Sequence, residues 1–263
     1  MDLMRLADRV ALITGAGSGI GRASAIKLSD AGAKIAGFDI DQEEINSLVQ
    51  DIQDKGGQGL GIVGDVSDPE AMRNAVSQVI DRWSRLDIVF ANAGINGLWA
   101  PIEEIEPQDW DKTIDTNLKG TYLTVKYAVP HLKKNGGSVI ITSSVNGTRK
   151  FSNSGATAYA SSKAAQVAFA KMIALELAND KIRVNVICPG WIQTNIEENT
   201  EKKDIETIRE PVKYPEGTIP LTDGKPGSPE QVAQLVLFLA SDASDLITGT
   251  EIWIDGGESL LQG

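Results

Sequence analysis

The chain has 263 residues, and its formal net charge of −11 argues against a nucleic-acid backbone or an anionic membrane surface as a partner. A single cysteine, Cys188, and a single histidine, His131, exclude an internal disulfide and a metal cage built from these residues, and they argue against a histidine-based triad. No apolar run approaches the roughly 20 residues that span a bilayer, and no secretory signal is recognisable, so we expect a cytoplasmic protein.

Short β-branched segments alternate with longer amphipathic segments along the chain. Residues 9–14, 34–39, 59–64, 87–91, 138–142, 183–187 and 251–254 are predicted strands. Residues 19–31, 41–55, 107–134, 156–178 and 229–240 are predicted helices, and Asp68 with Pro69 marks the start of another. Apolar strands separated by helices indicate a parallel sheet covered on both faces. We therefore predict one α/β domain over residues 1–263, a doubly wound Rossmann-type sheet of about seven strands.

The first predicted strand ends in a glycine-rich turn that leads directly into a helix. The turn reads Thr14-Gly15-Ala16-Gly17-Ser18-Gly19-Ile20-Gly21. Glycines at this place let the backbone approach a pyrophosphate and bring it onto the N–H groups of the helix N-terminus. Because the turn stands between the first strand and the first helix, it predicts a dinucleotide site.

The second predicted strand ends at Asp39, eighteen residues after Gly21. A carboxylate there can accept both ribose hydroxyls of the adenosine and would repel a 2′-phosphate. The alternative is that Asp39 caps the following helix. Because no lysine or arginine takes its place, we expect NAD rather than NADP.

Tyr159 and Lys163 are four residues apart on a predicted helix and therefore share one face. A cation about 6 Å from a phenol, at an effective dielectric of about 20, favours the phenolate by about 3 kcal/mol. That corresponds to roughly two pKa units, which brings a tyrosine within range of proton exchange with an alcohol. The other tyrosines, Tyr122, Tyr127 and Tyr214, are expected in the core or at the surface.

Further motifs accompany this pair in chain order. They are Asp65-Val66, Asn92-Ala93-Gly94, Asn117, Thr142-Ser143-Ser144, Pro189-Gly190 with Ile192 and Thr194, and the closing segment 249–257. Together with the glycine-rich turn and the Tyr159–Lys163 pair, they resemble the short-chain dehydrogenase/reductase family over essentially the whole chain.

The resemblance implies a cofactor role for several of these residues. Asp65 and Val66 would hold the adenine ring, and the turn Asn92-Ala93-Gly94 would steady the central sheet beside the adenosine. Thr142 is also expected at the cofactor. The nicotinamide amide would be held by Pro189, Gly190, Ile192 and Thr194.

The resemblance also implies the catalytic roles. Tyr159 would be the general acid/base and Ser144 the donor to the substrate oxygen, while Lys163 would lower the tyrosine pKa and hold the nicotinamide ribose. Asn117 would bend its helix locally and hold a water that links Lys163 to solvent. Should the strand end one residue earlier, Ser143 would be the pocket serine. The spacing from Ser144 to Tyr159 is slightly longer than is common in the family, which predicts an insertion in residues 145–157.

Residues 191–226 break the alternation of strands and helices, and the resemblance places a substrate lid there. Their charged part, 197–210, predicts one or two short helices. Apolar side chains that could face the pocket, or alternatively pack the lid onto the body, are Trp191, Ile192, Ile196, Ile205 and Ile208, with Leu98 and Trp99 as further wall candidates.

These observations predict an NAD(H)-dependent oxidoreductase that interconverts a small secondary alcohol, sugar-like or hydroxy-acid-like, and its ketone. One alternative is 3-oxoacyl-[acyl-carrier-protein] reductase, which the basic pair Arg149-Lys150 keeps open; another is a non-catalytic dinucleotide-binding scaffold. We expect a homotetramer, or a dimer, with outward apolar residues on two long helices buried against a second copy. These residues are Val125, Ala128, Val129, Val167 and Phe169.

Overall fold

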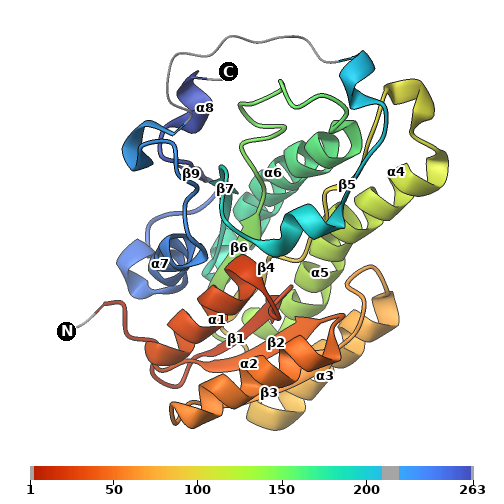
Figure 1. Ribbon diagram of the computed structural model, residues 1–263. Helices are drawn as coiled ribbons and strands as arrows, with labels where there is room; N and C mark the ends of the chain where they lie inside the picture. Colours follow the sequence, from red (N-terminus) through yellow and green to blue (C-terminus); the bar gives the residue numbers. More distant parts are fainter. Residues whose placement is uncertain (1–2, 209–218, 262–263) are drawn as a thin grey trace.

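The computed structural model describes residues 3–208 and 219–261. Seven parallel strands form one sheet in the order β3-β2-β1-β4-β6-β7-β9 (Figure 1). Their bounds are β1 Val10–Thr14, β2 Lys34–Asp39, β3 Gly59–Val63, β4 Ile88–Ala91, β6 Gly137–Thr142, β7 Ile182–Pro189 and β9 Glu251–Ile254. The winding direction reverses between β1 and β4, which confirms the predicted doubly wound sheet of seven strands.

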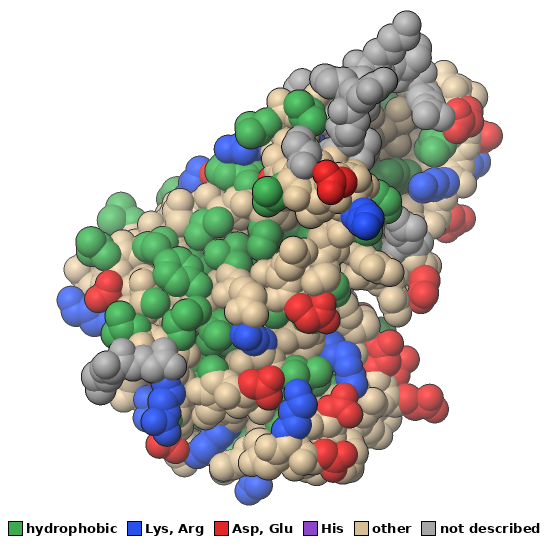
Figure 2. Space-filling view, turned by 60° about the vertical axis from the view of Figure 1, so that its left-hand side comes forward, with side chains coloured by type: hydrophobic (Ala, Val, Ile, Leu, Met, Phe, Trp, Pro, Cys, Tyr) green, Lys and Arg blue, Asp and Glu red, His purple; other side chains and the backbone are tan. Residues whose placement is uncertain are grey.

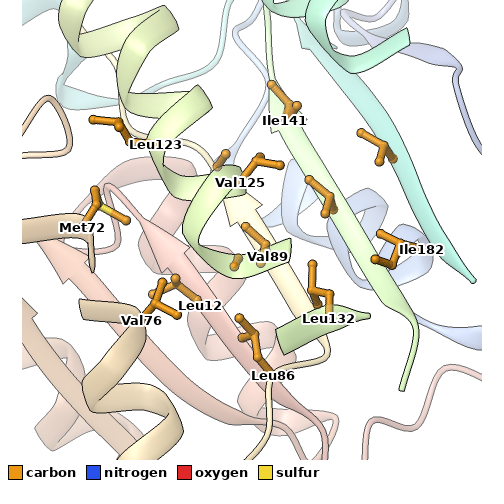
Figure 3. Close-up of a cluster of buried hydrophobic side chains, with 14 of the residues drawn as sticks. Leu12, Met72, Val76, Leu86, Val89, Leu123, Val125, Leu132, Ile141 and Ile182 are labelled. Carbon is orange, nitrogen blue, oxygen red and sulfur yellow. The ribbon is translucent and has the colours of Figure 1, made fainter. Parts of the chain in front are cut away.

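Helices cover both faces of this sheet (Figure 1). One face carries α1 (Gly19–Asp30), α2 (Gln42–Asp54) and α7 (Pro229–Ala240), and the other carries α3 (Pro69–Trp83), α5 (Gly120–Leu132) and α6 (Thr157–Leu177). Neighbouring residues of a strand point to opposite faces. Accordingly Leu12 of β1 packs beneath α3 and α5, and the adjacent Ile13 packs beneath α1 and α2. Figure 3 shows the first of these two clusters, in which Leu12 lies with Met72 and Val76 of α3.

Local sequence signals fix where several helices begin. The Asp68 carboxylate accepts from the backbone N–H of Glu70, and Pro69 takes the first helical position of α3, as predicted. Asp41 caps α2 in the same way, accepting from the N–H groups of Glu43 and Glu44. These caps supply partners for N–H groups that have none inside the helix.

The helix expected over residues 107–134 is not continuous. It consists of α4 (Pro107–Ile114), a π-helical segment η2 (Asp115–Lys119) and α5. A π turn inserts one residue into the helical repeat and widens it locally. The segment contains Asn117, so the structure has the local distortion that was expected at this residue.

The lid region has a strand where the sequence predicted only short helices. Residues 195–199 and 205–207 form 3₁₀ turns, and β8 (Thr200–Lys202) between them pairs in parallel with β5 (Gly97–Trp99). The pairing joins segments about a hundred residues apart, and such tertiary contacts override local propensity. The expected lid extends over residues 209–218, which lie outside the described residues.

Three of the apolar residues that we expected to face a second copy are instead buried in the chain's own core. Val125, Ala128 and Val167 are at most 9% exposed and pack between α5, α6 and the sheet. Val129 and Phe169 are partly buried against the same cluster. Within the part of the chain that the structure describes, we find no helix with the length and apolar character needed to cross a bilayer.

Candidate active site

A cavity of about 1030 Å³ opens at the carboxyl ends of the parallel strands. This is the edge where open α/β sheets bind their ligands. Seventeen of the eighteen residues predicted to bind the cofactor line it, and Gly21 is the exception. They are Gly15, Ser18, Gly19, Ile20, Asp39, Asp65, Val66, Asn92, Ala93, Gly94, Thr142, Tyr159, Lys163, Pro189, Gly190, Ile192 and Thr194.

The glycine-rich turn has the shape that close approach of a pyrophosphate requires. Gly15 and Gly19 have φ angles of +64° and +49°, a region that favours glycine. Gly21 lies behind the turn, where a β-carbon would be 1.8 Å from the Gly15 carbonyl oxygen. Glycine at this position therefore lets α1 begin directly beneath the turn, so that its first N–H groups face the cavity.

Carboxylates surround the place expected for the adenosine ribose. Asp39 accepts from the N–H of Gly17 at 2.8 Å through Oδ2 and from that of Ile40 at 2.7 Å through Oδ1. The cap of α2 is Asp41, so Asp39 is not required for that role. Burial raises the pKa of Glu44, and the nearby carboxylates of Asp39 and Asp41 raise it further. The three acidic groups thus create a negative potential where a 2′-phosphate would lie.

Asn92 connects three strands at the point where the winding direction reverses. Its Nδ2 donates to the carbonyls of Thr14 and Gly15 at 3.2 and 3.3 Å, and its Oδ1 accepts from the hydroxyl of Thr142 at 3.1 Å. This side chain holds the ends of β1, β4 and β6 together. Both residues of the Asp65-Val66 motif also line the cavity: Asp65 accepts from Ser67, and Val66 packs beside Gly120.

Tyr159 and Lys163 are both buried and lie one turn apart on α6. The Lys163 Nζ is 5.6 Å from the centre of the Tyr159 ring and donates to the Thr142 carbonyl at 2.9 Å. The Tyr159 hydroxyl is hydrogen-bonded to Ser144. Ser143 instead donates to the Lys163 carbonyl at 2.7 Å. Of the two serines, Ser144 is therefore the one beside the phenol.

The expected acidification of Tyr159 by Lys163 is not present in the protein by itself. Burial raises the pKa of Tyr159, and the hydrogen bond with Ser144 only partly opposes this effect. Burial also lowers the pKa of Lys163, to about 8. Loss of hydration disfavours the charged form of both groups, and it is the largest cause of both shifts.

The Tyr-x-x-x-Lys spacing is not unique to this pair. Tyr122 on α5 also has a lysine four residues later, and Lys126 Nζ donates to its hydroxyl at 2.9 Å. Tyr122 is 41% exposed, and neither residue lines the cavity. The spacing is the same in both Tyr-x-x-x-Lys pairs, and burial in the cavity wall distinguishes Tyr159–Lys163 from Tyr122–Lys126. Tyr127 packs at the edge of the core, and Tyr214 lies outside the described residues.

Asn117 lies behind the cavity wall rather than in it. Its Nδ2 donates to the Ile95 carbonyl and to Ser162 Oγ, each at 2.9 Å, and its Oδ1 accepts from the Ile95 N–H at 2.8 Å. The side chain is fully buried. Asn117 therefore ties the π-helical segment both to the turn after β4 and to α6.

The cavity wall has more polar groups than the sequence analysis identified. Trp99, Trp191, Ile192 and Ile196 line the cavity as expected, whereas Leu98, Ile205 and Ile208 do not. The groups that were missed include Asn146, Asn153, Asn195, Asn199, Lys202 and Glu258.

Glu258 is the least expected of these groups. It is buried at the C-terminal end of the fold in α8 (Glu258–Leu261), where its Oε1 pairs with Lys150 at 2.9 Å and its Oε2 accepts from the Trp191 N–H at 3.0 Å. The sequence analysis noted Lys150 only as part of the basic pair Arg149-Lys150 and did not predict this contact. The carboxylate follows the last strand, where no local pattern distinguishes it from a solvated residue.

Comparisons with known proteins identify the family. A family model described as enoyl-(acyl carrier protein) reductase matches residues 15–259. The 3-oxoacyl-[acyl-carrier-protein] reductase FabG of Thermotoga maritima is 40% identical over 255 residues, which are 97% of this chain and 99% of that protein. The chain belongs to the short-chain dehydrogenase/reductase family.

Solved structures of this family have the same fold. A 3-ketoacyl-ACP reductase from Sinorhizobium meliloti 1021 is 49% identical with a TM-score of 0.93, covering 96% of this chain and 99% of that one. A 3-ketoacyl-(acyl-carrier-protein) reductase from Brucella melitensis, complexed with NADH, is 29% identical with a TM-score of 0.85, covering 97% and 99%. As a short-chain dehydrogenase/reductase, the protein is an oxidoreductase that acts on CH–OH groups.

Proposed function

We propose that this short-chain dehydrogenase/reductase interconverts a small polar secondary alcohol, sugar-like or hydroxy-acid-like, and its ketone with NAD(H). The observation that carries the proposal is the buried Tyr159 hydroxyl, hydrogen-bonded to Ser144 at the wall of a cavity large enough for a dinucleotide and a small substrate. The glycine-rich turn, Asp39 and Asn92 support the binding of a dinucleotide in this cavity.

In the oxidation, the alcohol loses its hydroxyl proton and the hydride of its carbinol carbon. Tyr159 accepts the proton, and Ser144 donates a hydrogen bond to the oxygen that becomes the carbonyl. Lys163, held by the Thr142 carbonyl, orients the tyrosine and the nicotinamide ribose. When bound, a nicotinamide would supply the hydride acceptor or donor, and the positive charge of its oxidised form would favour the phenolate of Tyr159. In reduction the same groups act in reverse.

NAD is favoured over NADP by the carboxylates near the ribose. A 2′-phosphate would be repelled by Asp39 and by the neighbouring Asp41 and Glu44. The structure with NADH from Brucella melitensis supports a nicotinamide dinucleotide but does not itself fix the preference of this chain.

A polar substrate is favoured by polar groups in the cavity wall. Lys150 and Glu258 form a buried ion pair in the cavity wall, beside Asn146 and Asn153. A hydroxyl or carboxylate of the substrate could bond to them, whereas an apolar chain would leave them without hydration. The alternative, reduction of a 3-oxoacyl thioester, is supported by the names of the relatives in Thermotoga and Sinorhizobium.

The test is to follow the absorbance of the reduced nicotinamide over a panel of polyols, hydroxy acids and 3-hydroxyacyl thioesters, with NAD and NADP in parallel. We expect the highest kcat/KM with NAD and a small polar alcohol. A higher value with an acyl thioester would select the alternative. Cofactor binding without turnover of any substrate would favour a non-catalytic scaffold.

Tyr159→Phe should lower kcat by at least about a thousandfold, because it removes the group that exchanges the proton. NADH affinity should stay within a few-fold, since the ring remains in place. Tyr122→Phe is the matched control, because it changes the exposed member of the second Tyr-x-x-x-Lys pair and should leave kcat unchanged. Turnover near that of the wild type in Tyr159→Phe would contradict the assigned role.

A further inference from the structure

A glutamine that the proposed reaction does not use lies fully buried beside the catalytic pair. Gln166 is on α6, three residues after Lys163 and seven after Tyr159, and these spacings place the three side chains on one stripe of the helix. Its exposed fraction is 0%. A carboxamide buried to this extent costs free energy unless hydrogen bonds compensate for its lost hydration.

The Gln166 carboxamide is directed at the π-helical segment. Its Nε2 donates to the Asn117 backbone carbonyl at 2.9 Å and to Thr121 Oγ1 at 2.7 Å. Thr121 Oγ1 donates to the same carbonyl at 2.7 Å. Two side-chain donors therefore converge on one backbone oxygen, at the centre of a π turn of the kind that is frequent at functional sites.

The position of this carbonyl is coupled to the surroundings of Lys163. Asn117 is fixed at its side chain by Ile95 and Ser162. Gly94 lies between the two groups: a β-carbon there would be 3.1 Å from Asn117 Oδ1 and 3.4 Å from Lys163 Nζ. A shift of the π turn would therefore change the space and the polar groups around the ammonium.

The Oε1 of Gln166 has no hydrogen-bond partner among the described residues. Both N–H groups of the Asn117 side chain and its backbone carbonyl are already engaged. Gln166 Oε1 is thus an open acceptor in the buried network that adjoins Lys163.

We propose that Gln166 is a positioning residue for proton transfer at Tyr159 and Lys163, acting through the Asn117 carbonyl that it holds in the π turn. The inference rests on the proposed oxidoreductase function. Gln166 itself exchanges no proton; its two donors keep Asn117 and the turn at Gly94–Ile95 in the arrangement that sets the environment of Lys163.

Gln166→Met tests this inference, because methionine has a similar shape and no polar donor. With the alcohol that reacts fastest in the panel, kcat should fall by about tenfold or more and its pH profile should shift, while the KM for NAD stays within about twofold. Thr124→Val is the matched control. Thr124 is equally buried on α5 and donates to the Gly120 carbonyl in the same way, so the variant loses a comparable bond without touching Asn117.

Gln166→Glu separates positioning from simple support of the fold. A protonated carboxyl group can donate one hydrogen bond to the Asn117 carbonyl, whereas a carboxylate cannot. The ratio of its kcat to that of the wild type should therefore rise as pH falls, and the ratio for Gln166→Met should not follow this trend. Equal pH profiles in the wild type and Gln166→Met would overturn the inference, as would an equal shift in Thr124→Val.

A measurement that needs no substrate tests the role of Gln166 separately from the proposed function. The ionisation of Tyr159 in the complex with NAD can be followed by phenolate absorbance, with Tyr159→Phe subtracted. We expect the apparent pKa to shift in Gln166→Met and to stay unchanged in Thr124→Val. Failure of the wild type to turn over any alcohol would reject the proposed function, whereas an unshifted titration in Gln166→Met would reject the role of Gln166.

Discussion

The Asp39 carboxylate accepts hydrogen bonds from backbone N–H groups and lies near a second carboxylate, that of Glu44. The N–H groups of Gly17 and Ile40 orient it, and Glu44 lies close enough to Gly17 that a β-carbon there would be 2.7 Å from Glu44 Oε2. The Asp39 carboxylate is therefore held in place before a cofactor binds, which limits the side-chain entropy lost on binding.

Asp39→Ser should lower the preference for NAD over NADP by about tenfold or more, because it removes both the ribose acceptor and the nearest repulsive charge. Dissociation constants for NADH and NADPH, from quenching of protein fluorescence, measure the effect. Asp41→Ala is the comparison: it removes a flanking charge and the cap of α2, at a cost of about 1 kcal/mol of stability, but keeps the ribose acceptor, so it should lower the preference by less than Asp39→Ser does. An unchanged preference in Asp39→Ser would assign the discrimination to other groups.

Lys163 should make stability depend on pH in a defined window. Its pKa falls from 10.5 to about 8 in the folded protein, because burial removes the hydration of the ammonium. Between these values the unfolded chain binds more protons, so the stability contributed by this group rises with pH. Below pH 8 both states are protonated and the burial penalty is fully present.

Lys163→Met lacks this titration. From pH 8 to 10.5 the wild type should therefore gain up to about 3 kcal/mol relative to the variant in free energy of unfolding. Urea unfolding at several pH values measures the difference, in which the other titrating groups cancel. A difference that stays constant over the window would mean that Lys163 remains protonated in the folded protein.

At the scale of single residues, the sequence predicted which groups line the cavity better than it predicted their pKa shifts and their hydrogen-bond partners. The dinucleotide residues were located by motifs that are contiguous in the chain. The direction of the Tyr159 pKa shift was wrong, because spacing reports the neighbouring charge and not the loss of hydration. Glu258 was missed because its partners, Lys150 and Trp191, come from distant segments.

At the scale of elements, strands and helices with strong local patterns were predicted, and those that depend on tertiary contacts were not. The apolar strands β1 to β4 lie where expected, apart from one-residue differences at their ends. The strands β5 and β8 contain Trp99, Lys202 and other residues with no alternating pattern, and they pair only because the chain brings them together. The π segment likewise depends on contacts with α6, such as that of Asn117 with Ser162.

The β5–β8 pair fastens residues 200–202, which belong to the expected lid, to the segment that follows β4. Asn96 Nδ2 donates to Thr200 Oγ1 at 2.7 Å, and Lys203 N–H donates to the Trp99 carbonyl at 2.9 Å. Lys202 Nζ lies 5.6 Å from the centre of the Trp99 ring, which itself lines the cavity. The pairing therefore positions part of the cavity wall.

Thr200→Val should weaken substrate binding while the catalytic pair stays intact. The variant loses the acceptor for Asn96 and the donor to the Ile196 carbonyl. Loss of one such hydrogen bond costs about 1 kcal/mol, so the KM for the alcohol should rise about fivefold or more with a smaller change in kcat. Thr207→Val is the control in the same segment, because among the described residues its hydroxyl bonds to the Asp204 carbonyl at the surface. An equal change in both variants would exclude a specific role for the β5–β8 pair.

At the scale of the whole molecule, apolar side chains remain exposed on two faces. On α6, Met172 and Leu175 are 75% and 82% exposed, next to the half-exposed Tyr122 of α5. Figure 2 shows hydrophobic side chains gathered on the face that carries α7 and the C-terminal segment. Leu246 and Leu260, which follow α7 in the chain, are 94% and 75% exposed. Two such faces fit the expected homotetramer, in which each subunit uses two different two-fold interfaces.

Leu175→Glu tests this assembly. A two-fold interface contains the substituted residue twice, so two carboxylates would be buried together and the contact through α5 and α6 should open. Light scattering should show a tetramer reduced to a dimer, held by the remaining face, while NADH still binds because the cavity is not altered. Val63→Glu on the edge strand β3, where Val63 is 42% exposed, adds the same charge away from both faces and should leave the mass unchanged. A wild type that is monomeric, or a tetramer that survives Leu175→Glu, would show that this face does not join subunits.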